Sequence, residues 1–422
     1  MTERPTFGSE LRRRRQQAEL SLTQLAKQVH YSKGYLSKIE SGGKAPNPTL
    51  VRLCDAAVGA QGALIAVAAQ SSSADTDTDA SADLDTGTWQ MWLSPGGSGR
   101  FGHTDGASVD DTLAFAPTFG ADPASVLPLF RAHFDNARSL GQVLSPALVL
   151  PGLIGNTHTL TGIARHAPVG DGALWRLAAQ FAEFVGWMVQ ELGEDRTAMW
   201  WTTRAVRMAA IGGDESLRPY SLFRRTDITL FGAADPLRTL ELAQQAQADP
   251  AATARVRGLA AEREAQGYAL LGDPDACFRA LDRSATLLDE AKQASTGAPV
   301  LGTTRTPDPT ILARGWCLFD LGRPADAAEL LETGIDRFAP GASRARARYA
   351  MRTALAHITA DEVERACEIV TWLAPDLRQI DSATIRHDMI MVNREFRRRS
   401  TQPRVRDILP LFAELLRSQA TP

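Results

Sequence analysis

Cysteines are few in this chain, and they follow no pattern. The 422 residues include four cysteines, and these lie far apart at Cys54, Cys277, Cys317 and Cys367. Because no CxxC pair and no Cys/His spacing occurs, the sequence indicates neither a zinc site nor a disulfide framework. We expect four small buried thiols in a reducing compartment.

Long apolar runs and catalytic motifs are also missing. No stretch of about twenty consecutive apolar residues occurs, so no membrane span is expected, and residues 1–5 lack the apolar core of a signal peptide. The motifs GxSxG and HExxH and the glycine-rich nucleotide fingerprints are absent. The seven histidines are scattered. We therefore predict a protein that is not an enzyme and that holds no cofactor and no metal.

Positive charge gathers at the N-terminal end. The whole chain carries a net charge of −3, but residues 1–70 hold ten Lys and Arg against five Asp and Glu. These residues, the head, therefore carry +5, and the remainder carries −8. A basic head on an acidic remainder fits nucleic-acid binding confined to one end.

Residues 21–40 read as two short helices joined by a tight turn. Ser21 followed by Gln24 forms a capping box, and apolar residues then recur at helical spacing from Leu22 to Val29. Ser32 can cap a second helix, which Gly42 ends. Apolar residues at one side of that helix must pack on the first helix. Its other side stays free of acid and faces outward, with Lys33, Gly34, Ser37 and Lys38.

These residues carry a family resemblance. Ser21-x-x-Gln24-Leu25-Ala26, followed by Ser32-x-x-x-Leu36-Ser37-x-Ile39-Glu40-x-Gly42, resembles the helix-turn-helix of the phage-repressor (Xre/Cro) class. The resemblance spans residues 9–69 and implies a five-helix lambda-repressor-like domain whose second motif helix reads DNA in the major groove. The alternative interpretation of residues 21–40 is an ordinary helical hairpin. We expect the other three helices of the domain to begin after a cap at Ser9, to begin after a cap at Thr49, and to cover residues 63–69.

The resemblance and the outward face together predict the contacts with double-stranded DNA. The predicted residues are Arg12, Ser21, Ser32, Lys33, Gly34, Tyr35, Ser37, Lys38 and Lys44. Leu22, Gly34 and His30 depart from the residues common in the class, which leaves Lys33, Ser37 and Lys38 as the best candidates for reading bases. Arg15 resembles the arginine that pairs with the glutamate closing the recognition helix, here Glu40, and we predict a structural ion pair between them.

Composition changes sharply after the head. Residues 71–88 are rich in Ser, Thr, Asp and Ala, contain five aspartates and no basic residue, and read as a disordered tether. Residues 89–106 hold Trp89, Trp92 and Phe101 among Gly and Ser, and look like an extended arm. We therefore assign residues 71–109 to an acidic flexible linker with an aromatic arm, and residues 110–422 to a helical body.

The body contains an internal repeat. Gly186-Trp187-x-x-x-Glu191-Leu192-Gly193-x-x-x-x-Ala198 recurs as Gly315-Trp316-x-x-x-Asp320-Leu321-Gly322-x-x-x-x-Ala327. The segment Gly267-Tyr268-x-x-x-Gly272-x-x-x-x-Cys277 keeps the spacing of five from its turn glycine to a small residue. Weaker copies turn near Gly232 and Ala360. The pattern resembles tetratricopeptide (TPR) repeats and predicts an all-α chain whose body is a TPR-like α-solenoid. An irregular α-bundle is the alternative.

Together these features predict a sequence-specific DNA-binding transcriptional regulator that is cytoplasmic and nucleoid-associated. The order of parts resembles the peptide-sensing regulators of the RRNPP type and, more closely, the long Xre-like regulators of actinomycetes. The resemblance implies a homodimer whose body senses a peptide, a small molecule or a protein partner in a concave groove. The aromatic candidates for that groove are Trp187, Trp200, Trp201, Tyr268 and Trp316. For Trp187 and Trp316, packing between hairpins is an equal alternative.

A second function from another class fits the same sequence. The chain would then be a TPR scaffold or inhibitor that binds a protein partner, and its helix-turn-helix would only localise it.

Overall fold

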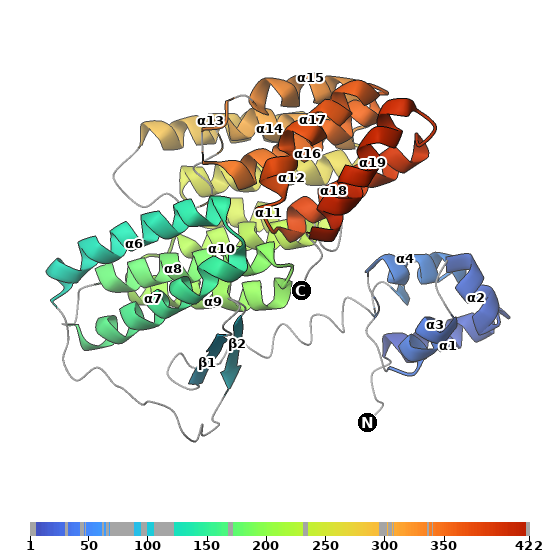
Figure 1. The fold of residues 1–422 in the computed structure, drawn as a ribbon. Helices are drawn as coiled ribbons and strands as arrows, with labels where there is room; N and C mark the ends of the chain where they lie inside the picture. The colour runs from blue at the N-terminus through green and yellow to red at the C-terminus, as the bar shows by residue number, and fades with distance from the viewer. Residues whose placement is uncertain are drawn as a thin grey trace. The chain divides into compact units, whose positions relative to one another are not determined.

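The computed structural model describes most of the chain. The described residues are 6–29, 33–42, 46, 48–60, 63, 64, 67, 88–93, 99–104, 122–167, 172–230, 235–294, 302, 306, 308–335, 337–339 and 341–418. The chain divides into two compact units, Met1–Thr88 and Trp89–Pro422, shown in Figure 1. The predicted tether lies outside the described residues, except for Thr88.

The head is helical. Its described helices are α1 (Phe7–Gln17), α2 (Leu22–Val29), α3 (Lys33–Glu40) and α4 (Pro48–Ala57). Most of the predicted fifth helix lies outside the described residues. The capping box of α2 is confirmed, because the Ser21 N–H donates to Gln24 Oε1 over 2.8 Å and the Gln24 N–H donates to Ser21 Oγ over 3.2 Å.

Two predicted helix starts are wrong by a few residues. Helix α1 is capped by Thr6, whose side chain accepts from the Ser9 N–H, so Ser9 lies inside the helix. Helix α4 begins at Pro48 rather than after a cap at Thr49. Proline is favoured in a first helical turn, where its missing N–H costs nothing.

The apolar faces of the head meet in one core. Leu25, Leu36 and Leu50 are fully buried in it, together with Leu11 of α1. Helix α3 lies tightly against α1 at Gly8, because a Cβ on Gly8 would come within 2.3 Å of the Ile39 carbonyl oxygen. The apolar side of α3 is thus held against α1, and the opposite side of α3 is exposed.

One two-stranded sheet follows the tether. Strands β1 (Thr88–Leu93) and β2 (Gly99–Thr104) pair with each other. The predicted arm is therefore extended as expected, and the pairing of its two halves is a feature that the sequence interpretation did not include. The burial of Trp89, Trp92 and Phe101 lies outside what the structure describes.

The body is helical from α6 to the end of the described chain. Its helices are α6 (Pro123–Val143), α7 (Pro146–His166), α8 (Ala173–Glu191), α9 (Asp195–Ile211), α10 (Leu217–Ile228), α11 (Pro236–Ala248), α12 (Ala254–Leu271), α13 (Pro274–Gln293), α14 (Pro309–Asp320), α15 (Pro324–Ile335), α16 (Ser343–Thr359), α17 (Val363–Leu377), α18 (Ala383–Arg398) and α19 (Pro403–Ser418). From α8 onward they pack as successive hairpins, α8 with α9 through α18 with α19. The body is thus repeat-like.

The turns between the paired helices share one geometry. Gly193, Gly272 and Gly322 each adopt a positive φ just after the first helix of a hairpin, and Asp361 does the same with φ 68°. In all four turns the next N–H donates to the carbonyl five residues earlier, over 2.9–3.3 Å. This bond satisfies the last turn of the helix. Asp361 therefore takes the place of the glycine, next to the turn predicted near Ala360, whereas Gly232 lies outside the described residues.

The glycine before the aromatic residue has a different place in one copy of the repeat. Gly186 lies against the second helix of its own hairpin, because a Cβ added to Gly186 would come within 3.1 Å of the Ala198 carbonyl oxygen. Gly315 also lies against the second helix of its hairpin, where an added Cβ would meet the Leu331 side chain. Gly267 instead faces Leu240 of the preceding hairpin. Counting back from the turn shows why. Gly186 and Gly315 stand seven residues before their turn glycines, and the residue at that distance from Gly272 is Ala265.

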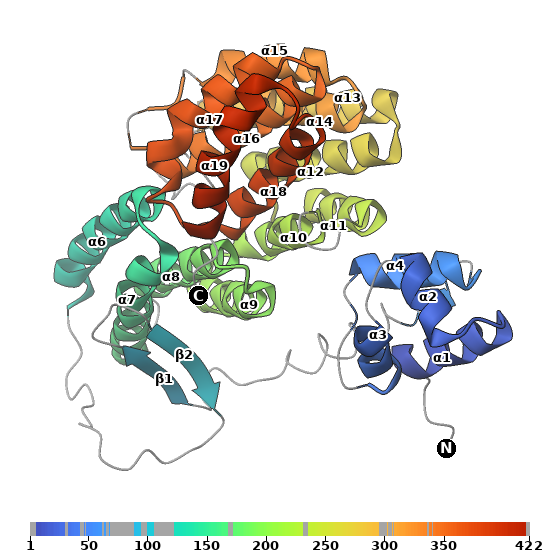
Figure 2. The same ribbon diagram turned by 45° about the vertical axis from the view of Figure 1, so that its right-hand side comes forward.

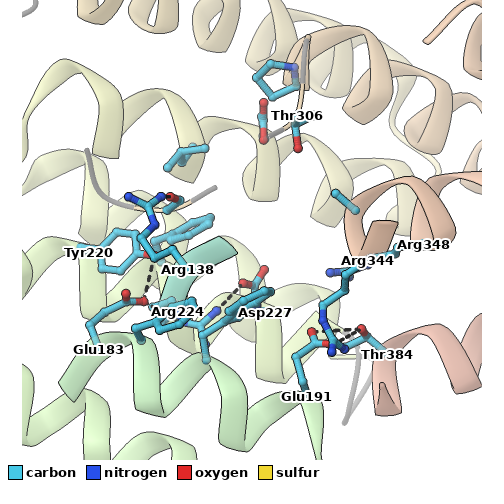
Figure 3. A pocket seen from close by; sticks show the side chains of 18 of the residues that line it. Arg138, Glu183, Glu191, Tyr220, Arg224, Asp227, Thr306, Arg344, Arg348 and Thr384 are labelled. Atoms are coloured by element: carbon cyan, nitrogen blue, oxygen red, sulfur yellow. Dashed lines mark hydrogen bonds and ion pairs between the residues drawn. The ribbon is translucent and has the colours of Figure 1, made fainter. Parts of the chain in front are cut away.

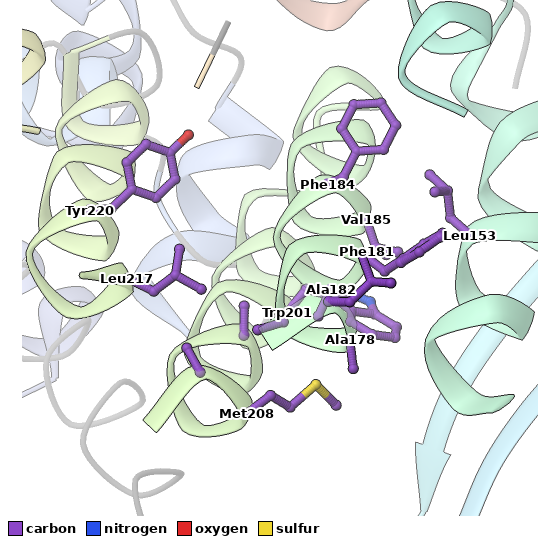
Figure 4. Packing of buried hydrophobic residues seen from close by; sticks show 14 of the residues in the cluster. Leu153, Ala178, Phe181, Ala182, Phe184, Val185, Trp201, Met208, Leu217 and Tyr220 are labelled. Carbon is purple, nitrogen blue, oxygen red and sulfur yellow. The ribbon is translucent and has the colours of Figure 1, made fainter. Parts of the chain in front are cut away.

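A large core joins the first helices of the body. Trp201 and Phe181 are fully buried there, between α7, α8 and α9, and Phe184 and Tyr220 belong to the same cluster (Figure 4). Tyr220 brings α10 into this core. The second large cluster covers α16 to α19 and includes Phe396 and Phe412 of the final hairpin, whose rings meet edge to face.

The first and last hairpins of the body also touch each other. Helix α6 packs against α16, and α8 packs against α18, an arrangement visible in Figure 2. At this closure a Cβ on Gly193 would lie 3.3 Å from that of Ala383. The predicted open groove is therefore bounded on this side by contacts between residues far apart in the chain.

A buried arginine holds this closure together. Arg344 of α16 donates through Nε to the Gly141 carbonyl over 2.8 Å, through Nη1 to the Asp381 carbonyl over 2.6 Å and through Nη2 to the Leu144 carbonyl over 2.6 Å. Its Nη1 also lies 3.1 Å from Glu191 Oε2. Only 3% of the Arg344 side chain and 4% of the Glu191 side chain are exposed. We call this set of contacts the Arg344 junction.

Hydroxyl groups complete the junction. Ser382 Oγ donates to Glu191 Oε2 over 2.5 Å, and Thr384 Oγ1 donates to Glu191 Oε1 over 3.3 Å. Burying a carboxylate is costly unless it is paired and hydrogen-bonded, and Glu191 satisfies both conditions. The junction thus ties α8, the α6–α7 connection, α16 and the start of α18 at one point.

Candidate functional sites

The outer face of α3 is open and basic. Lys33, Ser37 and Lys38 are exposed, whereas Leu36 and Ile39 point into the core. Gly34 is exposed too, and a Cβ built there would meet nothing within 4 Å. Within the described residues of the head, this face of α3 is therefore open to an approaching surface.

The remaining predicted DNA contacts divide into two groups. Ser21 and Arg12 are exposed. Ser32 and Lys44 lie outside the described residues, as does the side chain of Tyr35. The structure thus brings four exposed predicted residues together on α3 and adds Ser21 and Arg12 from the neighbouring helices.

The four consecutive arginines of α1 have different surroundings. Arg13 and Arg14 both bind Glu10, at 2.5 Å and 2.7 Å. The hydrogen bond from Arg13, with help from Arg14, lowers the pKa of Glu10 to about 2 although burial opposes the shift. Arg12 is exposed. Successive helical side chains point about 100° apart, which explains why the run does not act as one patch.

Arg15 and Glu40 form a two-point ion pair. Arg15 Nε lies 2.6 Å from Glu40 Oε1, and Nη2 lies 3.0 Å from Oε2. A third donor, Nη1, reaches the Leu20 carbonyl at 2.8 Å. The side chains are 12% and 7% exposed, and the hydrogen bond to Glu40 raises the pKa of Arg15 against the effect of burial. The pair joins the end of α3 to α1 and so fixes the angle of the exposed face.

The body encloses a central cavity of about 370 Å³. Its wall comes mainly from the first helices of the hairpins, α8, α10, α12, α16 and α18, with α6 closing one side. Figure 3 shows Arg138 beside Tyr220 and Glu183, and Arg344 and Arg348 beside Glu191 and Thr384. The volume lies in the lower part of the range for pockets that bind small ligands.

The cavity wall is rich in cations. Seven of the described lining residues are basic, namely Arg138, Arg224, Arg255, Arg263, Lys292, Arg344 and Arg348. Four are acidic, namely Glu183, Glu191, Asp227 and Glu262. This excess of three positive charges contrasts with the −8 of the chain beyond residue 70.

Several acidic groups of the wall are already engaged. Asp227 lies 2.6 Å from Arg263 and 3.2 Å from Arg224. Glu183 accepts a hydrogen bond from the Tyr220 hydroxyl over 3.1 Å, and burial raises its pKa despite the nearby Arg224. Burial also raises the pKa of Glu262 to about 7, against the lowering effect of its basic neighbours. The wall therefore carries less uncompensated negative charge than a count of its carboxyl groups suggests.

One of the five aromatic residues predicted for the groove lines this cavity. Trp187 lines the cavity. Trp201 is fully buried in the core around α9, and Trp200 packs at its edge. Trp316 is buried with the Arg352 guanidinium 3.6 Å from its ring centre, and Tyr268 lies beside Gln244 of α11. Within the described chain, these four do not line the cavity.

The cavity-lining arginines are the residues that sequence reasoning missed. Six of them fall on α6 or on the first helix of a hairpin. The repeat pattern gives the inward side of these helices, so a count of charges on that side would have identified the basic wall. The interpretation followed aromatic residues instead.

The described residues contain no group of three or more His, Cys, Asp and Glu side chains that could hold a metal ion. The four cysteines are free and buried, as expected. Among the described helices, none is both long enough and apolar enough to cross a membrane.

Comparison with known proteins identifies the head. A family model described as a helix-turn-helix domain matches residues 6–68. A search of curated proteins returned no match to the chain. The chain therefore has an N-terminal helix-turn-helix domain, of a kind that binds DNA in regulators, followed by a repeat-like helical body.

Proposed function

We propose that the protein is a sequence-specific DNA-binding transcriptional regulator of the Xre/Cro type. The match of residues 6–68 to a helix-turn-helix domain carries the proposal. The exposed face of α3 supports it, since Lys33 and Lys38 can reach phosphates and Ser37 can reach base edges. Gly34 leaves room for the backbone of α3 to approach the groove closely.

We propose further that the TPR-like body senses a ligand and dimerises. The central cavity supports a sensing role, because it is a concave space with aromatic walls and converging polar groups. Helix-turn-helix dimers of this class read two half-sites about 34–36 Å apart. A ligand that changes the body dimer would change whether two heads can reach both half-sites.

The DNA-binding role is tested with the full chain in a gel-shift assay against DNA from beside its own gene. Lys38→Ala should lower affinity for operator and random DNA by similar factors and reduce the salt slope by about 1, if Lys38 contacts phosphate. If it reads a base, specificity should relax instead. Affinity should fall steeply between about 50 and 200 mM salt.

Arg13→Ala is the matched control for this assay. It removes the same charge from the head, but Arg13 is already bound to Glu10 on α1. Its effect should be clearly smaller than that of Lys38→Ala. Equal losses in the two variants would remove α3 from the interface, and binding of a protein partner without any DNA binding would favour the scaffold function.

The dimer is tested by analytical ultracentrifugation of the full chain, paired with binding to full and half operators. Two tethered heads raise the effective concentration of the second binding event. A dimer should therefore prefer the full operator far more than a single half-site. A monomer at micromolar concentration would contradict this part of the proposal.

A further inference from the structure

The central cavity has a chemistry that narrows the class of ligand. Its wall combines the aromatic side chains Phe134, Phe184, Trp187, Tyr220, Phe223 and Tyr349 with the seven basic residues named above. The body as a whole is acidic, so a basic interior is not a consequence of average composition. Cations that line a desolvated space lower the free energy of a bound anion more than they would in water.

Two of these cations oppose each other. Arg255 of α12 is half-buried, and burial lowers its pKa although the charges of Tyr220 and Glu262 oppose the shift. The positive charge of Arg138 on α6 also lowers the pKa of Arg255. Both residues line the cavity. An anion placed between these two side chains would be attracted by both of them.

The size of the space argues against a long occupant. A cavity of about 370 Å³ suits a compact molecule rather than an extended peptide or a helix. The Arg344 junction also bounds the cavity where an open solenoid would allow a long chain to pass. Arg344 and Thr384 belong both to the junction and to the cavity wall.

We propose that the central cavity binds a small organic anion, in which a carboxylate, sulfonate or phosphate group is joined to an aromatic or branched apolar part. The anionic group lies toward Arg138 and Arg255, and the apolar part packs on the aromatic wall. This inference rests on the proposed sensing role of the body. It concerns binding to the body alone, so it can fail while DNA binding holds, and the reverse is also true.

The test uses two dyes with the same ring system and the full chain. 8-Anilinonaphthalene-1-sulfonate carries one sulfonate, and N-phenyl-1-naphthylamine lacks it. The sulfonated dye should bind saturably, with one site per chain, and at least about tenfold more tightly than the neutral dye. Energy transfer from tryptophan to the dye should fall in Trp187→Phe, because Trp187 lies in the cavity wall.

Three variants test the sign of the charge effect. Arg255→Gln should weaken binding of the sulfonated dye about tenfold and leave the neutral dye unchanged. Glu262→Gln removes negative charge from the wall and should tighten binding of the sulfonated dye roughly threefold. Arg257→Gln is the matched control, because Arg257 lies two residues further along α12 and is not part of the described wall.

Melting temperatures separate a binding site from a merely structural cluster. Arg255→Gln should lower dye affinity while changing the melting temperature no more than Arg257→Gln does. Equal affinity for the two dyes, non-saturable binding, or the same result for Arg255→Gln and Arg257→Gln would overturn the proposal. So would weaker binding of the sulfonated dye to Glu262→Gln.

Discussion

The ion pair of Arg15 and Glu40 shows how a single residue pair can position an interface without touching DNA. Both side chains are largely buried, and each has the other as a two-point partner. Such a pair does not have to stabilise the fold relative to apolar residues, but breaking it leaves one buried charge without compensation. Its main effect is to hold the end of α3 on α1.

Glu40→Ala should therefore destabilise the head by roughly 3 kcal/mol, because Arg15 would keep its charge at a helix junction with only the Leu20 carbonyl as partner. Thermal unfolding of the head, followed by circular dichroism, measures this loss. Arg12→Ala is the contrasting variant, since Arg12 is exposed, and it should leave the melting temperature unchanged while weakening DNA binding. An unchanged melting temperature in Glu40→Ala would contradict the structural role.

A second residue-scale prediction concerns the pH dependence of stability. The pKa of Glu262 is about 7 in the folded chain, against 4.5 for the group in water. Between pH 4.5 and 7 the folded state therefore binds more protons than the unfolded state, and stability falls as the pH rises through this window. The Glu262→Gln variant cannot ionise at this position, so it does not lose this stability as the pH rises. It should match the wild type at pH 5 and be more stable by roughly 1–3 kcal/mol at pH 8.

Glu264 on the same helix provides the control for this measurement. It is buried as well, but it forms an ion pair with Arg283 and accepts from Gln247 Nε2 over 2.7 Å. Glu264→Gln should lower stability at both pH values, because it breaks a satisfied pair. If chemical denaturation shows Glu262→Gln to be less stable than the wild type at pH 8, the carboxylate of Glu262 stabilises the fold and the pH argument fails.

At the scale of elements, the repeated turn explains why the hairpins have similar ends. Gly322 adopts φ 76°, and a Cβ there would touch nothing within 4 Å. A side chain at position 322 would therefore destabilise the turn only through the positive φ and not through a steric clash. Asp361 adopts φ 68° at the equivalent place in the hairpin of α16 and α17, so it carries strain that glycine would not.

Reciprocal substitutions should have opposite effects at these two turns. Gly322→Ala should destabilise the body by about 1 kcal/mol, and Asp361→Gly should stabilise it by roughly 0.5–1 kcal/mol. The exposed ion pair of Asp361 with Arg399, 3.3 Å long, adds little to the balance. Urea denaturation of the full chain measures both changes. A loss of stability in both variants would show that Asp361 is held for its side-chain contacts.

Sequence signals that act within a few residues explain which helices and helix ends could be predicted. The capping box of Ser21 and Gln24 and the apolar spacing of α2 and α3 act within a few residues, so the sequence alone predicted them. The start of α1 was misplaced because Thr6 and Ser9 can both cap a helix, and only packing of Phe7 in the core chooses between them. Tyr268 follows a glycine as Trp187 and Trp316 do, but that glycine stands five residues before the turn glycine rather than seven.

At the scale of the whole molecule, closure of the body could not be read from the sequence. Arg344 and Glu191 are 153 residues apart. Glu191 stands in the repeat and Arg344 in no motif, so nothing in the sequence pairs the two. Repeat patterns report contacts between neighbouring hairpins, and they contain no information on whether the last hairpin meets the first. The closure bounds the cavity, and of the aromatic residues predicted for the groove only Trp187 is among its described lining residues.

The Arg344 junction leads to the last prediction. Arg344→Ala would leave Glu191 buried with only the hydroxyl groups of Ser382 and Thr384, and it would remove the donor from three buried carbonyls. We expect a loss of roughly 3–5 kcal/mol in the closed state. Because the hairpins on either side keep their own cores, the loss should first separate the first hairpins from the last. Hydrogen exchange should rise in residues 141–144 and 381–385 before it rises in α12 or α13.

Arg346→Ala separates this effect from a general weakening of α16. Arg346 lies two residues further on and pairs with Asp376 of α17, within its own hairpin, so its loss should leave exchange at 141–144 unchanged. The double variant Arg344→Met with Glu191→Met should recover much of the stability, because replacing both members of a buried pair by apolar residues is often neutral. A uniform rise of hydrogen exchange across the body in Arg344→Ala would instead mean that the body unfolds as one unit. The Arg344 junction would then have no separate role in closing the cavity.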